Sequence, residues 1–226
     1  MQSFDIVKNN PIKNVSFRVS KVQADFDVSL EHVKEHFVGK IDIPEKWNIG
    51  LIVGGSGTGK STIAKELWGD HYIRGFDYSA ECVIDDMPKD ASVEEITRTF
   101  YAVGFGSVPS WLKPYSVLSN GEKMRVDLAR TLLEKDFAVF DEFTSVVDRQ
   151  VAQTACIAIS KAIKKQDKQI ILVSCHYDII EWLQPDWIFD TNQMKNFFAI
   201  AHDRNKSTPL KDATCASGQS LADIII

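Results

Sequence analysis

The feature that most constrains this chain is a glycine-rich segment of the form Gly-x-x-x-x-Gly-Lys-Ser. Its residues, called the phosphate loop below, are Gly54, Gly55, Ser56, Gly57, Thr58, Gly59, Lys60 and Ser61. The preceding residues 49–53 are almost continuously apolar, as expected of a buried parallel strand. After the loop, Ile63, Ala64, Leu67 and Trp68 share one face of a helix. The sequence therefore predicts a strand, a glycine-rich turn and a helix in direct succession.

This succession has a specific chemical use. Glycines let the backbone curve so that several N–H groups point inward at a phosphate, and the helix N-terminus adds partial positive charge. Lys60 is expected to reach the β- and γ-phosphates, and the Ser61 hydroxyl to ligate Mg²⁺. An ordinary glycine turn would not require these flanks, so the segment predicts a nucleotide-binding site.

Composition sets bounds on the class of protein. The 226 residues are 44% hydrophobic and 25% charged, which is typical of a globular protein with a sizeable core. A net charge of −5 gives no overall attraction to nucleic acid, although a local basic patch stays open. We expect no membrane span and no secretory signal. Four cysteines without paired spacing predict reduced thiols in a cytoplasmic protein, at positions Cys82, Cys156, Cys175 and Cys215.

The N-terminal region predicts an antiparallel β region. Short β-rich runs occur at 4–7, 17–22, 25–28 and 37–43. Adenine needs an aromatic stacking surface, and Phe26 is the candidate, with Phe17 and Phe37 as rivals or as core residues. His32 and His36 are spaced to share a helical face, but without a third ligand we interpret them as surface residues.

Residues 81–84 predict a strand that ends at Asp85 and Asp86. These acids are equally consistent with a place near Mg²⁺ and with an exposed turn. Ser92 to Glu95 form a capping box that begins a helix ending at Gly104. With the loop that follows, residues 88–117 predict a small helical insertion.

A second capping-box sequence, Leu118-Ser-Asn-Gly-Glu122, begins the next predicted helix. Ser119 and Glu122 are explained by the cap alone. Gly121 is not, because glycine inside a helix costs about 1 kcal/mol relative to alanine. A glycine in the first turn suits close approach of a ligand to the backbone.

The apolar run 137–140 ends in Asp141 and Glu142. Acids at the carboxyl end of a buried parallel strand lie where ligands bind in open α/β sheets. Asp141 is expected to hold Mg²⁺, directly or through water, and Glu142 to polarise the attacking water. A pair of surface acids is the less favoured alternative.

The last third continues the alternation of helix and strand. A helix after Ser145–Asp148 precedes a buried strand at 170–173, and His176 follows that strand beside the acidic pair, in reach of a γ-phosphate or its water. A terminal hairpin is predicted from 187–189 and 197–200. We expect residues 203–226 to be poorly ordered or to pack on a partner.

Taken together, these motifs in this order resemble an ATP-binding cassette (ABC-type) ATPase, over roughly residues 15–200. The resemblance implies an α/β P-loop NTPase of ABC-ATPase type, with an N-terminal antiparallel β region and a short helical subdomain. The predicted ATPase domain is 1–202, its helical subdomain about 88–133, and the tail 203–226. By position, Gly54 to Thr62 match the Walker A loop, Ser119 to Glu122 the signature, and Asp141 and Glu142 the Walker B acid and catalytic glutamate. Ser145 to Asp148 match the D-loop and His176 the switch histidine.

Family members act as head-to-tail dimers that enclose ATP between two subunits. The resemblance thus implies that Ser119 and the Gly121 N–H meet the γ-phosphate of the partner, and that Lys60, Glu142 and His176 act in catalysis. The chain departs from the family at Asn120, where glycine is usual, and at Glu122, where glutamine is usual. No glutamine occupies the lid position after 81–84, where Asp85 or Asp86 stands instead.

The resemblance leaves several functions open. The stretch between phosphate loop and signature is short for a transporter subunit, which favours a soluble ATP-hydrolysing homodimer with an unidentified protein or nucleic-acid partner. The alternatives are the nucleotide-binding subunit of a transporter whose membrane chain is separate, and an ATP-sensing module. A P-loop kinase is the weakest alternative, because it leaves the signature and His176 unexplained.

Overall fold

The fold is built on one mixed sheet. The computed structural model describes residues 1–9, 14–27, 34–145 and 147–198. The strands lie in the spatial order β4 (Phe137–Phe140), β5 (Gln169–Ser174), β3 (Ile49–Val53), β6 (Trp187–Asp190) and β7 (Lys195–Phe198). The first four are parallel, and β7 pairs antiparallel with β6. The predicted strands 49–53, 137–140 and 170–173 and the terminal hairpin are therefore confirmed, although residues 199–200 of the hairpin lie outside the described residues.

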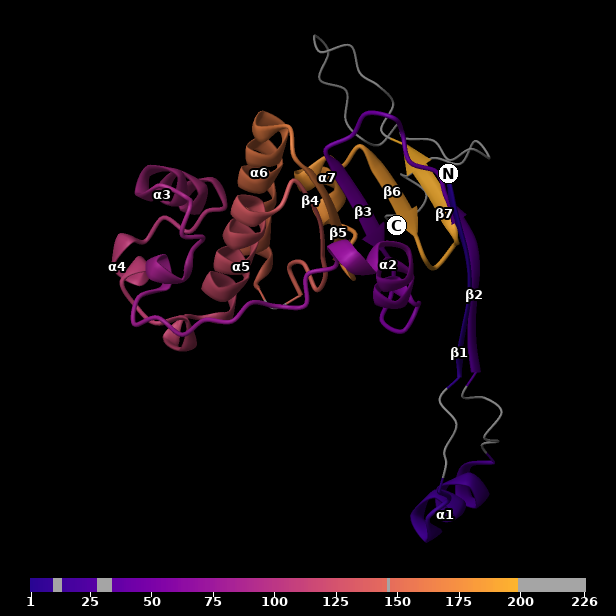
Figure 1. Cartoon of the computed structure of the whole chain (residues 1–226). Coiled ribbons are helices and arrows are strands. Elements are labelled where there is room, and N and C mark those ends of the chain that lie inside the picture. The colour runs from indigo at the N-terminus through magenta and orange to yellow at the C-terminus, as the bar shows by residue number, and fades with distance from the viewer. Residues whose placement is uncertain (10–13, 28–33, 146, 199–226) are drawn as a thin grey trace.

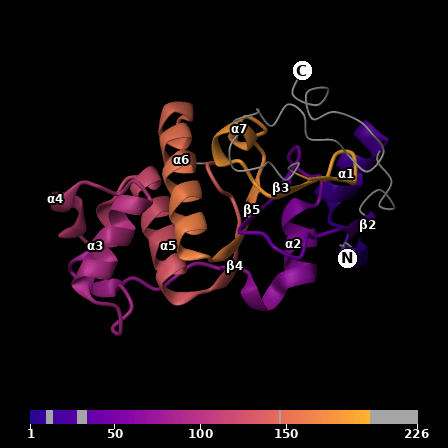
Figure 2. The same ribbon diagram turned by 90° about the horizontal axis from the view of Figure 1, so that it is seen from above.

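Both faces of this sheet are covered, because alternate residues of each strand enter two separate cores. In β3, Leu51 and Val53 join one core and Ile52 joins the other. Helices α5 (Asn120–Glu134) and α6 (Arg149–Gln166) pack on the first face, and α2 (Lys60–Trp68) packs on the second (Figures 1 and 2). This double cover explains why the parallel strands are continuously apolar.

The N-terminal region differs from the prediction. Strands β1 (Gln2–Asn9) and β2 (Lys34–Ile41) form the expected antiparallel pair, which packs beside α2 through Phe4, Phe37 and Ile41. The intervening Phe17–Phe26 is a helix, α1, so the predicted strand at 17–22 is wrong, as is the part of the predicted strand 25–28 that lies within the described residues. Ser16 caps its N-terminus by accepting from the Val19 N–H, and Asp27 ends it at φ 50°. The Ser16 cap was the signal in the sequence that predicts this helix.

The helical insertion has the predicted helix after the Ser92 capping box, but it is also helical within the predicted loop after Gly104. It contains α3 (Val93–Ala102), α4 (Val108–Trp111) and the 3₁₀ turn η4 (Tyr115–Val117), which lie beyond α5 from the sheet (Figure 1). The Ser92 capping box and the left-handed Gly104 after α3 are both present. The remaining short elements are η2 (Gly69–His71), η3 (Val83–Asp86) and α7 (Ile179–Leu183). In the described ranges, no helix is long and apolar enough to cross a membrane.

Candidate functional site

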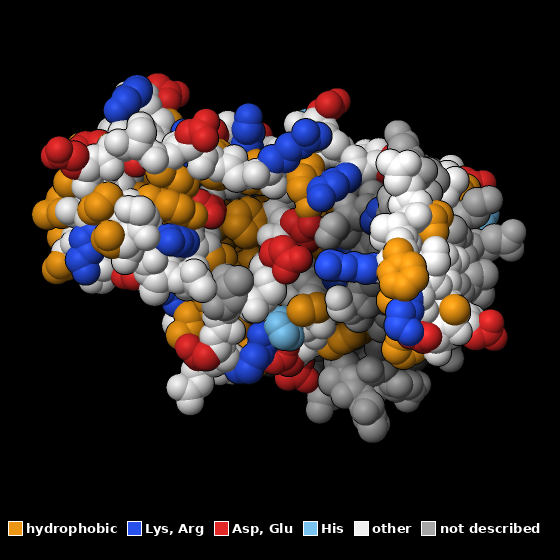
Figure 3. All heavy atoms as spheres, turned by 90° about the horizontal axis from the view of Figure 1, so that it is seen from below, with side chains coloured by type: hydrophobic (Ala, Val, Ile, Leu, Met, Phe, Trp, Pro, Cys, Tyr) orange, Lys and Arg blue, Asp and Glu red, His pale blue; other side chains and the backbone are white. Residues whose placement is uncertain are grey.

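The carboxyl ends of three parallel strands meet at one edge of the sheet. Val53 lies opposite Ser174, and Phe140 lies opposite Leu172, so β3, β4 and β5 end close together. The phosphate loop, the acidic pair and His176 each follow one of these strands. Figure 3 views the molecule from this side and shows acidic side chains in the middle of the face with basic ones beside them. The structure thus gathers three predicted motifs at one edge, as parallel topology requires.

The phosphate loop has the conformation of an anion site. Gly57 and Gly59 have φ values of 81° and 87°, a region that favours glycine. Helix α2 starts at Lys60 without a side-chain cap, which leaves the first amides of the helix, including those of Ser61 and Thr62, free of a capping group. Such a helix start binds phosphate through its N–H groups and dipole. The Lys60 ammonium donates to the Gly55 carbonyl at 2.6 Å, so it lies against the loop it is expected to serve.

Two residues that follow β6, Thr191 and Asn192, hydrogen-bond to the phosphate loop. The Gly55 N–H donates to Asn192 Oδ1 at 3.1 Å, and the Thr58 and Thr191 hydroxyls share a hydrogen bond of 2.5 Å. Asn192 in turn donates to the Tyr177 hydroxyl at 2.8 Å. Sequence reasoning placed residue 192 only in a turn, because no local pattern shows a contact between residues 137 apart.

The acidic pair lies in a sharply turned segment. Glu142 has φ 55°, and its N–H donates to Asp141 Oδ1 at 2.8 Å. The Phe143 N–H donates to the Val173 carbonyl at 2.9 Å, which returns the chain to β5. The turn leaves the Glu142 carboxylate exposed, as a residue that must meet a water molecule requires.

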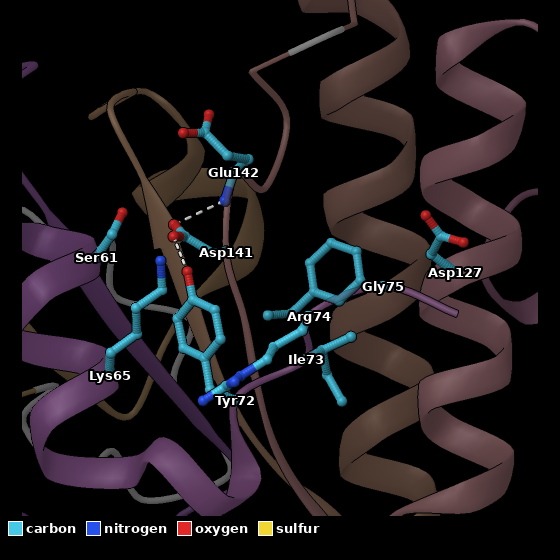
Figure 4. A pocket seen from close by; sticks show the side chains of 10 residues that line it. Ser61, Lys65, Tyr72, Ile73, Arg74, Gly75, Asp127, Asp141 and Glu142 are labelled. Atoms are coloured by element: carbon cyan, nitrogen blue, oxygen red, sulfur yellow. Dashed lines mark hydrogen bonds between the residues drawn. The ribbon is translucent and has the colours of Figure 1, made fainter. Parts of the chain in front are cut away.

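A pocket of about 760 Å³ joins α2, the acidic pair and α5 (Figure 4). Ser61 enters it from α2, Asp141 and Glu142 from the end of β4, and Asp127 from α5. The remaining wall is Tyr72–Gly75, called the lid segment below. Tyr72 forms a parallel bridge with Val139 in β4, so this segment runs along the edge of the sheet.

The prediction for the lid position is therefore wrong. Residues 83–86 form the 3₁₀ turn η3 rather than the end of a strand. Asp86 accepts from the Ser79 and Ala80 N–H groups at 3.0 and 3.1 Å, and neither Asp85 nor Asp86 lines the pocket that contains Ser61. The place beside β4 belongs to Tyr72, whose hydroxyl donates to Asp141 Oδ2. Sequence reasoning missed Tyr72, because only Tyr72 and Ile73 contact the edge of β4. A segment of two residues is too short to show the alternation of apolar and polar residues that predicts a strand.

The donor set suits Mg²⁺. Ser61 offers a hydroxyl and Asp141 a carboxylate, and both side chains line the same pocket. Within residues 1–9, 14–27, 34–145 and 147–198, no group of three or more His, Cys, Asp or Glu residues is placed to hold a metal. One hydroxyl and one carboxylate match a cation that takes its other ligands from water and phosphate.

Two aromatic residues fix the α5 wall of the pocket. The Tyr78 and Tyr115 hydroxyls donate to Asp127 at 2.7 and 2.9 Å, and their rings stack with centroids 3.8 Å apart. Burial raises the pKa of Asp127, and burial together with the Asp127 charge raises the pKa of both phenols. This clamp, Tyr78–Asp127–Tyr115, ties the chain after the lid segment to α5.

The signature residues lie outside this pocket. Ser119 caps α5, and its hydroxyl accepts from the Glu122 N–H at 3.3 Å while the Glu122 carboxylate accepts from the Ser119 N–H at 2.9 Å. A Cβ at Gly121 would lie 3.1 Å from Val147, so packing within the chain already favours glycine there. Within one chain, residues 119–122 do not line the pocket with Ser61 and Glu142.

Phe26 does not reach the phosphate loop. It lies near the end of α1 with 72% of its surface exposed, beyond the far end of the β1–β2 pair (Figure 1). Its rival Phe37 is close instead, because a Cβ on Gly59 would lie 2.5 Å from the Phe37 ring. Phe37 is buried and supports the loop from beneath. His36 lies on β2 and contacts Asp5 at 2.6 Å, and His32 lies outside the described residues.

His176 follows β5 and is partly buried. Burial and the nearby Arg149 guanidinium lower its pKa, while Asp178 opposes this effect. Arg149 donates to Asp178 through Nε at 2.8 Å. The ring is therefore expected to be neutral at pH 7, able to accept or donate one hydrogen bond.

This charge state is testable by NMR. We expect the His176 titration to have its midpoint below the ordinary histidine value of about 6.5. Arg149→Gln removes the cation and frees Asp178, so it should raise the midpoint. An unchanged midpoint in the variant would contradict the proposed influence of Arg149.

Comparisons with known proteins agree with this geometry. No family model matches the chain. It is 27% identical over 230 residues to the energy-coupling factor transporter ATP-binding protein EcfA1 of Staphylococcus aureus, covering 82% of this chain and 80% of that protein. Its structure is similar to cbiO1 from Clostridium perfringens, part of the ABC transporter complex cbiONQ, with TM-score 0.54 and 20% identity over 69% of this chain and 78% of the other.

A second solved structure is a dimeric post-hydrolysis state of the ATP-binding cassette MJ0796 with ADP and Pi. It matches with TM-score 0.51 and 16% identity over 69% of this chain and 87% of the other. The chain has the fold of an ATP-binding cassette. The predicted resemblance and the predicted fold class are thus confirmed. EcfA1 is named as a transporter ATP-binding protein, and cbiO1 as part of a transporter complex. The assignments of individual site residues stay predictions.

Proposed function

We propose that this cassette is an ATPase that hydrolyses Mg-ATP in a head-to-tail dimer and serves as the nucleotide-binding subunit of an ABC transporter. The observation that carries the ATPase assignment is the pocket in which Ser61, Asp141 and Glu142 converge beside the phosphate loop. The transporter assignment rests on the relatives, and replaces the soluble ATPase that the short helical insertion favoured.

The chain's own residues divide the work of hydrolysis. The phosphate-loop amides and Lys60 bind the β- and γ-phosphates, and Ser61 and Asp141 hold Mg²⁺, which neutralises charge on the phosphates when bound. Glu142 accepts a proton from the attacking water, for which its exposed carboxylate is available. The neutral His176 accepts or donates a hydrogen bond at the γ-phosphate.

A dimer supplies the signature residues that one chain does not bring to its own pocket. In the proposed arrangement Ser119 and the Gly121 N–H of one subunit face the γ-phosphate held by the other. The rate per subunit should therefore rise with protein concentration, and the average mass in solution should rise toward that of a dimer with Mg-ATP. A monomer with a concentration-independent rate would contradict the dimer.

The membrane partner needs a separate experiment. The cassette should co-sediment with membranes from its native cells and lose this association after extraction of membrane proteins. The three described cysteines are free, which is consistent with a place on the cytoplasmic side of the membrane. A fully soluble distribution alongside ATP-dependent dimerisation would favour the second candidate, an ATPase with a cytosolic protein or nucleic-acid partner. Almost no turnover would favour an ATP sensor.

Two capping boxes of the same form give a matched test of the signature. Ser92 caps α3 and Ser119 caps α5 with the same reciprocal contacts to a glutamate three residues later. Ser→Ala at either cap should lower the free energy of unfolding by about 1 kcal/mol. Ser119→Ala alone should also weaken ATP-dependent dimerisation and lower the ATPase rate, by about tenfold for one lost hydrogen bond to a charged group. Equal effects of both variants on dimerisation would contradict the role of Ser119.

A further inference from the structure

The Tyr72 hydroxyl is hydrogen-bonded to one of the two side chains expected to hold Mg²⁺. It donates to Asp141 Oδ2, and Ser61 lines the same pocket. Figure 4 shows this bond as a dashed line between Tyr72 and Asp141, with Ser61 on the neighbouring α2. The phenol therefore occupies one oxygen of the carboxylate that is expected to bind the cation.

The backbone fixes this placement. The Ile73 N–H donates to the Val139 carbonyl at 2.9 Å, two residues before Asp141, and Tyr72 pairs with the same strand residue. The Lys65 ammonium lies 4.8 Å from the centroid of the Tyr72 ring. Backbone and ring are thus held, and the hydroxyl can leave Asp141 only if the side chain or the lid segment moves.

The charge of the phenol makes it a competitor rather than a ligand. A tyrosine phenol carries its proton at neutral pH, so it offers Asp141 a hydrogen-bond donor rather than a negative charge. That proton points at Asp141 Oδ2. The other oxygen, Oδ1, already accepts from the Glu142 N–H. Both carboxylate oxygens therefore already accept one protein hydrogen bond, so a directly bound cation either displaces a donor or shares an oxygen with a donor whose partial positive charge repels it.

We propose that the Tyr72 hydroxyl competes with the divalent cation for Asp141, so that cation binding requires the lid-segment tyrosine to leave the acidic pair. This inference rests on the proposed function in one respect, namely that Ser61 and Asp141 hold a cation with the nucleotide. Tyr72 is a positioning residue in this scheme: it holds Asp141 in place without the cation and gives it up when the cation arrives.

The competition connects the metal to the rest of the molecule. Three residues after the lid segment, Tyr78 belongs to the clamp that holds α5 through Asp127. The lid segment that carries Tyr72 is therefore joined, through Tyr78 and Asp127, to α5, the helix that Ser119 caps.

The experiment measures Mn²⁺ affinity, with Mn²⁺ as the paramagnetic probe, on the whole chain with a non-hydrolysable ATP analogue. Tyr72→Phe removes the competing hydroxyl and keeps the ring beside Lys65. We expect the Mn²⁺ dissociation constant to fall about tenfold, within the range for loss of one hydrogen bond to a charged group. Tyr115→Phe is the matched control, since it removes a phenol bonded to Asp127 and should leave Mn²⁺ affinity unchanged.

The outcomes separate this inference from the proposed function. Unchanged or weaker Mn²⁺ binding by Tyr72→Phe, with normal binding by the wild type, would overturn the competition alone. Failure of the wild type to bind Mn²⁺ with nucleotide would overturn the metal site and this inference together. If Tyr72→Phe does not fold, Tyr72→Leu gives a second hydroxyl-free side chain for the same measurement, with the same tighter binding expected and the same contrary result.

Discussion

Glu142→Gln is expected to lower the rate of ATP hydrolysis by at least about 10²-fold, the lower end of what a general base contributes. The variant keeps the amide geometry of the turn, because the Glu142 N–H rather than its side chain holds Asp141. Glutamine also tolerates the left-handed φ of 55° about as well as glutamate. Binding of ATP should therefore persist while proton transfer fails, and phosphate release under single turnover measures the difference.

The same variant should stabilise the ATP-bound dimer. A dimer that closes on ATP and opens after hydrolysis accumulates when hydrolysis is blocked, so the mass in solution with Mg-ATP should show more dimer than the wild type. Glu94→Gln is the control, since that acid lies in the first turn of α3. Hydrolysis by Glu142→Gln at the wild-type rate would remove Glu142 from the mechanism.

Gly59→Ala is expected to cost about 2 to 5 kcal/mol of unfolding free energy. Two penalties add: the left-handed φ of 87° costs a residue with Cβ about 1–2 kcal/mol, and overpacking of a filled core costs about 1–3 kcal/mol. The second penalty arises because the new Cβ would lie 2.5 Å from the ring of the buried Phe37. Urea unfolding without nucleotide measures the sum.

Gly57→Ala separates the two penalties. Gly57 has nearly the same φ, 81°, but no atom lies within 4 Å of its added Cβ. This variant should show only the backbone penalty, about 1–2 kcal/mol. Equal losses from the two substitutions would contradict the packing of Phe37 beneath the loop. Gly59→Ala should also weaken nucleotide binding, because the displaced loop no longer aims its amides at phosphate.

The predictions that succeeded depend on neighbouring residues. Capping boxes at Ser92 and Ser119 need only four consecutive residues, and both form as predicted. The apolar runs before Gly54 and Asp141 predicted buried strands, because a strand covered on both faces requires little else. Parallel topology then brought those two motifs to one edge, and the pocket contains Ser61, Asp141 and Glu142 together.

The predictions that failed concern residues whose structure depends on distant partners or on competing local signals. Residues 17–22 alternate as a strand would, but they belong to helix α1. Ser16 caps the start of this helix, the left-handed Asp27 ends it, and none of its side chains is buried. Residues 81–84 looked like a strand, but Tyr72 and Ile73 already take the free edge of β4. The lid position was therefore assigned to the wrong segment.

The amino-acid order by itself determined the phosphate loop, the acidic strand end and the two helix caps, because each is a contact between residues a few positions apart. Tertiary structure alone decided that Asn192 braces Gly55, that Phe37 rather than Phe26 lies beneath the loop, and that Tyr72 bonds to Asp141. These three contacts join residues far apart in the chain, and they form only once β4, β5, β3 and β6 pair in register and β2 packs beside α2.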